Sequence, residues 1–441
     1  MRIIQFAAGW LVLLSACGGG DGGAPPTPPS SFSIGGNVSG LVAGSPVSLT
    51  NNSATSPLVV SANAPFTFPV AVALGGSYAV TVVAQPVGQI CTISNGSGTN
   101  VTGNVTSVSV VCAAAPPEFA YVLNSGDNTV SQYTISLDGA LTPTGVPVAT
   151  GRFPSGIALS TVGRFAYVTN FADENTSQFS RGLTGQLAAS GSATASTCCE
   201  PFSITLDPLG RYAFILSPPG RVEQYAVGLD GQLTDASSAL AGGISAAAMA
   251  IDPTGRFAYV ANPERGSVSQ FSIGPTGALI ALSPSTVPTE ALPVSIAIDP
   301  SGAHLYVSNA QSASVSQFSI APTGTLAALT PATVAGGTSP GAIGIDPSGR
   351  YAYVLNPSQK LILQFAVAAD GSLSATSVSS AATGTRPGSL SIDPAGRFVY
   401  VTNQSDNTVS QYSIGATGEL TALASATVAT GGRPTFVVTS R

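Results

Sequence analysis

Residues 251–282 read IDPTGRFAYVANPERGSVSQFSIGPTGALIAL, and residues 298–329 read IDPSGAHLYVSNAQSASVSQFSIAPTGTLAAL. Seven versions of this phrase fill the chain from Phe119 onward. The steps between their equivalent aromatic residues are 46, 47, 45, 47, 47 and 47, at Tyr121, Tyr167, Phe214, Tyr259, Tyr306, Tyr353 and Tyr400. A period of this length, filled with short alternating strands, predicts an all-β fold. Specifically, it predicts a seven-bladed β-propeller with one four-stranded sheet per blade.

The two ends of the repeat region predict how the ring closes. Six repeats begin with an inner strand before the aromatic one, such as residues 295–299. The first repeat has none, because prolines and a glutamate at 116–118 precede Tyr121. A matching segment stands at 434–439, at the end of the chain. We therefore predict that the C-terminal strand completes the first blade and leaves no open sheet edge.

The first residues predict export to the cell envelope. Arg2 precedes an apolar run at 3–14, which is shorter than the about 20 residues of a membrane span. The run leads into Leu-Ser-Ala-Cys at 14–17, which resembles a bacterial lipobox and implies lipid attachment at Cys17. No aspartate follows Cys17 directly, a pattern that in Gram-negative lipoproteins usually resembles sorting to the outer membrane. Residues 1–17 are then the lipoprotein signal, and the Gly- and Pro-rich residues 18–31 a tether.

Residues 32–115 form a separate region before the propeller at 116–441. They lack the repeated phrase and contain strand-like stretches at 32–38, 47–50, 58–61, 66–72, 78–84 and 105–111. This pattern predicts a small β-sandwich of immunoglobulin-like or carboxypeptidase-regulatory-like type, with a spacer or adhesive role. Cys91 and Cys112 lie in this region, and in an oxidising compartment we expect them to form a disulfide.

Composition narrows the partners. Only 8% of the residues are charged, the net charge is −6, and Lys360 is the single lysine. Binding to nucleic acid needs clustered cations, so we expect none. No second apolar segment approaches the length of a membrane span, so we expect membrane contact through the lipid alone. We also expect no cofactor and no metal, and a monomeric protein.

Residues that recur in every blade are best explained by the scaffold. One glutamine per repeat is expected to form hydrogen bonds between blades, at Gln132, Gln178, Gln224, Gln270, Gln317, Gln364 and Gln411. Most repeats also contain an Asp-Pro-x-Gly turn. We expect the arginine that follows such a turn to pair with the acid in it.

Three arginines outside this scaffold form the candidate binding site. Arg152, Arg386 and Arg433 each lie one or two residues before the proline that begins an inner strand, in blades two, seven and one. These blades are consecutive in a closed ring. We predict that the guanidinium groups converge at the channel mouth and attract a carboxylate or phosphate. The alternative is that they pair with nearby acids, namely Asp127, Asp173, Glu174 and Asp406.

Cys198 and Cys199 occupy the corresponding loop of blade three. Adjacent cysteines can form a vicinal disulfide, which would stiffen this loop; redox chemistry is the alternative. A zinc site lacks the second pair of ligands that it would need.

The Tyr-Val-x-Asn segments at 121–124, 167–170, 353–356 and 400–403, with Asp-Pro-x-Gly-Arg turns before most of them, resemble lactonase-type seven-bladed propellers. That family includes 6-phosphogluconolactonase-like and carboxymuconate-cyclising enzymes and surface proteins with YVTN repeats. The resemblance implies a site of His, Arg and Glu groups near the channel mouth. The single histidine, His304, instead replaces an aromatic residue beside an Asp-Pro turn, so we interpret it as structural.

Lactone hydrolysis needs a group that activates water and a group that stabilises an oxyanion. Glu200 or Glu290, each shortly before an inner strand, are weak candidates for the first role, and the arginines for the second. A Ser-His-Asp triad is excluded by the misplaced histidine.

Two functions therefore remain open. The first is a lipid-anchored binding propeller whose channel mouth holds a small anionic molecule, a glycan or a protein loop. The second is a lactone hydrolase or cycloisomerase acting on a sugar-acid or muconate-type lactone. We favour the first, because phosphorylated sugar lactones are cytoplasmic whereas this chain is predicted to be exported.

Overall fold

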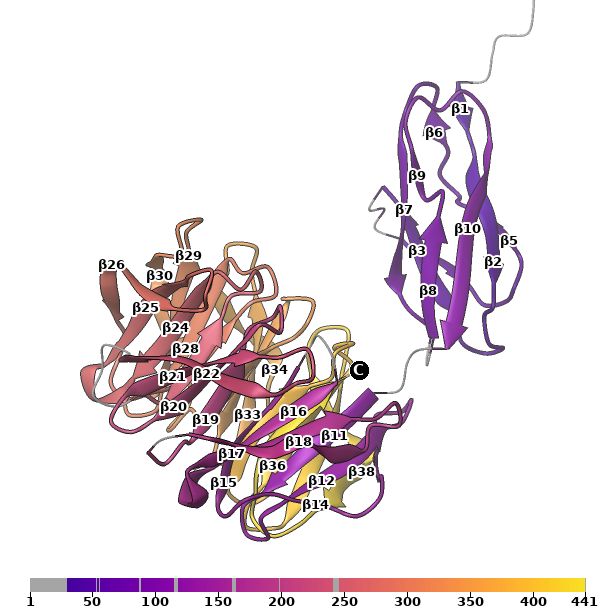
Figure 1. Ribbon diagram of the computed structural model, residues 1–441. Helices are drawn as coiled ribbons and strands as arrows, with labels where there is room; N and C mark the ends of the chain where they lie inside the picture. Colours follow the sequence, from indigo (N-terminus) through magenta and orange to yellow (C-terminus); the bar gives the residue numbers. More distant parts are fainter. Residues whose placement is uncertain are drawn as a thin grey trace, which may run out of the picture. The chain divides into compact units, whose positions relative to one another are not determined.

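The computed structural model describes residues 30–440, apart from 53, 55, 87–88, 115–117, 161–163, 198 and 241–245. The chain divides into two compact units, Met1–Ala115 and Pro116–Arg441 (Figure 1). The predicted lipid-bearing Cys17 lies outside the described residues. Within the described ranges, no helix has both the length and the apolar character that crossing a membrane requires.

The first unit contains two four-stranded sheets that enclose one core. One sheet has the order β5 (Pro65–Thr67), β2 (Ile34–Ser39), β10 (Val105–Ala114), β8 (Gln89–Ser94), and the other has the order β4 (Leu58–Val60), β3 (Val47–Asn51), β7 (Tyr78–Ala84), β9 (Ser97–Gly98). Alternate residues point inward and leave Ile34, Val38, Val47 and Leu49 with no exposed surface. Burial of these side chains holds the two sheets together.

The predicted disulfide is present in this unit. Cys91 on β8 lies directly opposite Cys112 on β10 in the strand register, and their sulfurs are bonded. The strand containing Cys91 was not predicted from the sequence.

The strand predicted at 66–72 was wrong in extent, because β5 ends at Thr67 and residues 68–71 are not in a strand. Proline at position 69 has no N–H to give to a ladder. The chain then forms β6 (Val72–Ala73), which pairs with β1 (Ser31–Phe32) instead.

The second unit is the predicted propeller of seven sheets. Blade 1 contains β39 (Pro434–Ser440), β11 (Glu118–Asn124) and β12 (Thr129–Ile135), with an outer edge of β13 (Leu141–Pro143) and β14 (Val148–Ala149). Blades 2 to 4 are β15 (Pro154–Leu159), β16 (Phe165–Asn170), β17 (Asn175–Arg181), β18 (Leu187–Ser196); β19 (Ser203–Leu206), β20 (Tyr212–Ser217), β21 (Arg221–Val227), β22 (Leu233–Leu240); and β23 (Ala248–Ile251), β24 (Phe257–Asn262), β25 (Ser267–Ile273), β26 (Leu279–Pro288). Blades 5 to 7 are β27 (Pro293–Ile298), β28 (His304–Asn309), β29 (Ser314–Ile320), β30 (Leu326–Ala335); β31 (Ile343–Ile345), β32 (Tyr351–Asn356), β33 (Leu361–Val367), β34 (Leu373–Ala382); and β35 (Pro387–Ile392), β36 (Phe398–Asn403), β37 (Thr408–Ile414), β38 (Leu420–Ala429).

The ring closes through the C-terminal strand, as predicted. β39 pairs antiparallel with β11, with Phe119 opposite Ser440 and Val122 opposite Val437. The inner strands of neighbouring blades also pack side by side, so β39 contacts both β35 of blade 7 and β15 of blade 2. In Figure 1 the yellow C-terminal strands accordingly lie beside the purple strands of blade 1.

Buried tyrosines connect each second strand to the next blade. Six of them donate from the hydroxyl to a glycine carbonyl of the neighbouring blade at 2.5 to 3.0 Å, as in Tyr121 to Gly185 and Tyr400 to Gly139. Gly185 has a φ of +79°, and a Cβ there would come within 2.1 Å of the Phe119 ring. Only glycine fits this turn without strain.

The repeated glutamines form the predicted hydrogen bonds between blades. In six blades the Oε1 atom accepts the N–H of the leucine that begins the next outer strand, at 2.6 to 2.7 Å. In blade 3, Gln224 donates from Nε2 to the carbonyl of Thr276 in blade 4 at 2.7 Å.

The Asp-Pro-x-Gly turns form the face of the propeller opposite the candidate site. Asp393 is buried, and its Oδ1 accepts the N–H groups of Arg397 and Phe398. Arg397 and Arg211 pair with their turn acids, as expected. The expectation was wrong for Arg256 and Arg350, which donate to the hydroxyls of residues 254 and 348 because these lie between guanidinium and acid.

Candidate functional site at the channel mouth

Two sets of loops meet on one face of the propeller. The antiparallel register places the proline that begins an inner strand opposite the asparagine that ends the second strand, as in Pro154 opposite Asn170 and Pro387 opposite Asn403. We call the residue directly before this proline the rim residue of its blade. The rim residues, from blade 1 around the ring, are Arg433, Phe153, Glu200, Leu292 in blade 5, Ser339 in blade 6 and Arg386 in blade 7. The counterpart in blade 4 lies outside the described residues.

Five of the six described rim residues share an unusual backbone conformation. Arg433, Phe153, Glu200, Leu292 and Arg386 have φ values between 50° and 59°, in the left-handed region that residues other than glycine rarely adopt. In four of these blades, the carbonyl of the rim residue accepts an N–H from the residue after the asparagine, at 2.8 to 3.1 Å. Leu292 shares the conformation, so the turn belongs to the scaffold. Among these five blades the rim residues differ in their side chains, whereas Ser339 of blade 6 lacks the positive φ.

The acids near the arginines are part of the same turn. Asp127, Asp173 and Asp406 accept the backbone N–H of the residue just before the rim residue, at 2.5, 2.7 and 2.5 Å. Ser312 and Gln359 do the same in blades 5 and 6. This hydrogen bond therefore belongs to the scaffold. In blades 1 and 7 it uses one carboxylate oxygen of the acid nearest to the rim arginine.

Arg152 lies one residue before the rim of blade 2 and follows the pairing alternative. Its Nε is 2.6 Å from Oδ1 of Asp173, and its Nη2 donates to the carbonyl of Ala172 at 3.3 Å. These hydrogen bonds hold the pKa of the Asp173 carboxyl below its ordinary value, with the backbone N–H of Arg152 as the largest cause. Arg152 is thus not a rim residue, whereas Arg386 and Arg433 are.

Arg386 and Arg433 are both exposed. Their rim positions are neighbours, because the inner strands that follow them, β35 and β39, lie side by side. Among the described residues, neither guanidinium group has an ion-pair partner or a hydrogen bond. The Arg433 guanidinium stacks over the ring of Phe153, with Cζ 5.6 Å from the ring centroid. Phe153 in turn packs against Phe171 at 5.8 Å. Stacking fixes the side chain and leaves its N–H donors available.

The two candidate glutamates lie at different positions. Glu200 is the rim residue of blade 3 and is exposed. Glu290 is also exposed but lies two residues before the rim residue of blade 5. Cys199, beside Glu200, is disulfide-bonded and has a φ of 60°. Cys198 lies outside the described residues.

His304 is far from this site in the fold. Its Nδ1 lies 3.2 Å from Oδ2 of Asp299 in the turn of the opposite face, and its ring packs against Gly371. In the part of the chain that the structure describes, no three His, Cys, Asp or Glu side chains gather as metal ligands would.

One functional candidate was missed by the sequence reasoning. Phe153 takes the rim position in blade 2 that arginine takes in blades 1 and 7, and its ring supports Arg433. A signal existed in the sequence. In blades 3, 5, 6 and 7 the rim residue lies seven positions before the aspartate of the Asp-Pro turn, as Leu292 does before Asp299. In blade 2 the residue equivalent to this aspartate is Ser160, which places Phe153 and not Arg152 at the rim.

These features define a seven-bladed propeller with two arginines, an aromatic ring and a carboxylate along one arc of its channel mouth. A family model for "Lactonase, 7-bladed beta-propeller" matches residues 221–330 and 322–439. The propeller of this chain belongs to that lactonase-type family.

Solved structures share the fold. A candidate 6-phosphogluconolactonase from Bacteroides fragilis is 20% identical, with a TM-score of 0.65 over 74% of this chain and 98% of that chain. A periplasmic gluconolactonase from Pseudomonas aeruginosa is 22% identical, with a TM-score of 0.62 over 74% of this chain and 99% of that chain. At these identities the likeness establishes the fold. No curated protein matches the chain.

Proposed function

We propose that the channel mouth binds a small organic anion, with a sugar acid as the best match to the side chains present. The observation that carries the proposal is the pair of exposed arginines, Arg386 and Arg433, at equivalent rim positions of adjacent blades without a partner among the described residues. Guanidinium groups recognise carboxylates through paired N–H donors.

The neighbouring rim residues suit the rest of such a ligand. Phe153 is 44% exposed and offers an apolar surface beside Arg433. Glu200, in the next blade, would accept hydrogen bonds from hydroxyl groups. A compact anion with an apolar face and several hydroxyls would use all four rim residues on this arc. The protein would then be a binding propeller, as we favoured from the sequence.

A lactone hydrolase or cycloisomerase is the second candidate. Glu200 occupies the same rim position as the two arginines, so a lactone held by the arginines would face a carboxylate that could activate water. The arginines would stabilise the oxyanion that forms when water attacks the carbonyl. The family membership supports this alternative, and Glu290, two residues off the rim, has a weaker claim.

The test measures binding and turnover together. We expect D-gluconate to bind the full chain in isothermal titration calorimetry, and the Arg386→Ala/Arg433→Ala double variant to bind about 100-fold more weakly. Arg265→Ala, an exposed arginine in blade 4, removes one positive charge elsewhere on the ring and should change little. Equal affinity of the double variant and the parent would end the proposal.

Hydrolysis of aldonolactones and muconolactones by the same samples separates the two candidates. Turnover that disappears in the double variant and in Glu200→Gln would establish the lactonase. The absence of turnover together with arginine-dependent gluconate binding supports the binding protein.

We also propose that the protein is anchored in the cell envelope by a lipid on Cys17, in the outer membrane, and that it is a monomer. The lipobox-like sequence and the Cys91–Cys112 disulfide, which is typical of oxidising compartments, support this location. Cys17→Ala should move the protein from the membrane fraction to the soluble fraction.

A further inference from the structure

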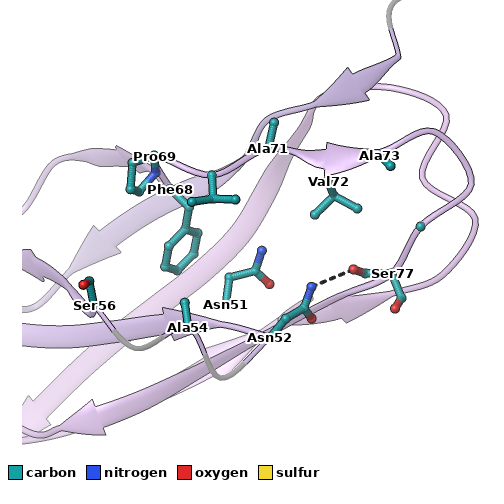
Figure 2. Close-up of a pocket in the computed structure, with 12 residues that line it drawn as sticks. Asn51, Asn52, Ala54, Ser56, Phe68, Pro69, Ala71, Val72, Ala73 and Ser77 are labelled. Atoms are coloured by element: carbon teal, nitrogen blue, oxygen red, sulfur yellow. Dashed lines mark hydrogen bonds between the residues drawn. The ribbon is translucent and has the colours of Figure 1, made fainter.

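We propose that the N-terminal unit binds an uncharged saccharide in a pocket of its own, independently of the propeller. The pocket has a volume of about 400 Å³ (Figure 2). It lies between Asn51, Asn52, Ala54 and Ser56, at and after the end of β3, and residues 68–77, which connect β5 to β7. This volume falls within the range of small-molecule sites.

The lining indicates a neutral ligand. None of the residues that line the pocket carries an ionisable side chain. A charged ligand would lose its hydration there without gaining a partner of opposite charge, which is costly. A neutral ligand pays no such cost.

Asn51 supplies a polar group that is buried and available. Its side chain is 9% exposed, and its Oδ1 accepts the N–H of Ala79 at 3.1 Å. The Nδ2 atom has no hydrogen-bond partner among the described residues. Figure 2 shows this nitrogen turned into the pocket, toward the segment that carries Ala71 and Val72. A ligand oxygen that accepts this N–H would satisfy an otherwise unpaired donor.

The other walls provide both apolar and polar contacts. The ring of Phe68 and the side chain of Val72 form apolar surface on one side of the pocket (Figure 2). Opposite them, Asn52 donates from Nδ2 to the carbonyl of Ser77 at 2.9 Å, which leaves its Oδ1 as an acceptor. Ser77 also lines the pocket. A saccharide combines C–H faces, which pack on such apolar surface, with hydroxyls that both donate and accept.

The experiment uses saturation-transfer NMR and calorimetry on the full chain with glucose, galactose, N-acetylglucosamine and maltose. We expect at least one of them to bind with a Kd below about 10 mM. Asn51→Asp keeps the acceptor for the Ala79 N–H but removes the Nδ2 donor, and should weaken binding at least about 10-fold. Ala71→Trp, at an exposed position of the lining, should block the pocket without touching Asn51.

Asn37→Asp is the matched control, because Asn37 is exposed on β2 and lies outside the pocket. It should bind like the parent, and melting curves verify that all variants fold. No binding by any of the four sugars would overturn the proposal. Equal binding by Asn51→Asp and Ala71→Trp, or uptake of an apolar dye in place of sugars, would also overturn it. Because the propeller is unchanged in these variants, the result is independent of gluconate binding at the channel mouth.

Discussion

Single side chains decide whether blades are joined and whether the channel mouth is charged. The second strand carries a buried tyrosine in six blades and Phe214 in blade 3, which shows that the ring fits without the hydroxyl. The hydroxyls therefore add hydrogen bonds to a packing arrangement that is already complete. At the rim the opposite holds, because the same backbone turn carries arginine, phenylalanine, glutamate or leucine.

Removal of one buried tyrosine hydroxyl should have a measurable cost. Tyr400→Phe leaves the carbonyl of Gly139 without its 2.8 Å hydrogen bond in a buried site. We expect the free energy of unfolding to fall by about 1–2 kcal/mol, measured by urea denaturation. Tyr351→Phe is the matched control, because its bond to Ala416 is exposed and water replaces it. Equal costs for the two changes would contradict this account of the blade contacts.

The buried tyrosines also predict instability in alkali. Burial raises the pKa of Tyr121 to about 12 and raises the pKa of Tyr167, Tyr259, Tyr306, Tyr353 and Tyr400 above the ordinary value. An unfolded tyrosine loses its proton near pH about 10, so the unfolded state binds fewer protons above that pH. Stability should hold below pH about 10 and fall as the pH rises toward 12.

Urea unfolding at a series of pH values, with tyrosinate absorbance recorded in parallel, checks this expectation. Complete ionisation of all tyrosines near pH about 10 in a protein that stays folded would contradict it.

At the scale of elements, β39 is the strand on which the ring depends. It pairs with β11 and packs against both β35 and β15, and Val437 within it is buried. Deletion of residues 432–441 should lower the free energy of unfolding of the propeller by at least about 3 kcal/mol, because it opens a sheet edge and exposes apolar surface. Chemical denaturation measures the loss.

Addition of a synthetic peptide of residues 432–441 should restore part of this stability by filling the vacant edge. A truncated protein that unfolds at the same denaturant concentration as the parent would show that closure by β39 contributes little.

For the whole molecule, the sequence predicted the propeller well because the same strand pattern is written seven times, so errors in one blade are corrected by the others. The first unit has no such redundancy, and β8 and the break at Pro69 were missed. The arc of rim residues proposed to bind the ligand was predicted only in part. Arg386 and Arg433 follow from their position before proline, but a shift of one residue places Arg152 on Asp173 instead.

The pocket beside Asn51 could not be predicted at all. It forms between segments whose approach depends on how two sheets enclose one core, and no motif in either segment reports that distance. A repeated sequence pattern predicts the strands that recur in each blade. A cavity depends on packing between segments that have no repeated pattern in common.

A crystal structure of the full chain soaked with D-gluconate tests the central claim most directly. The account predicts the carboxylate of the ligand between the guanidinium groups of Arg386 and Arg433, with its carbon chain toward Phe153. Gluconate bound at another face of the propeller, or a channel mouth that stays empty at a concentration that saturates binding in solution, would contradict it.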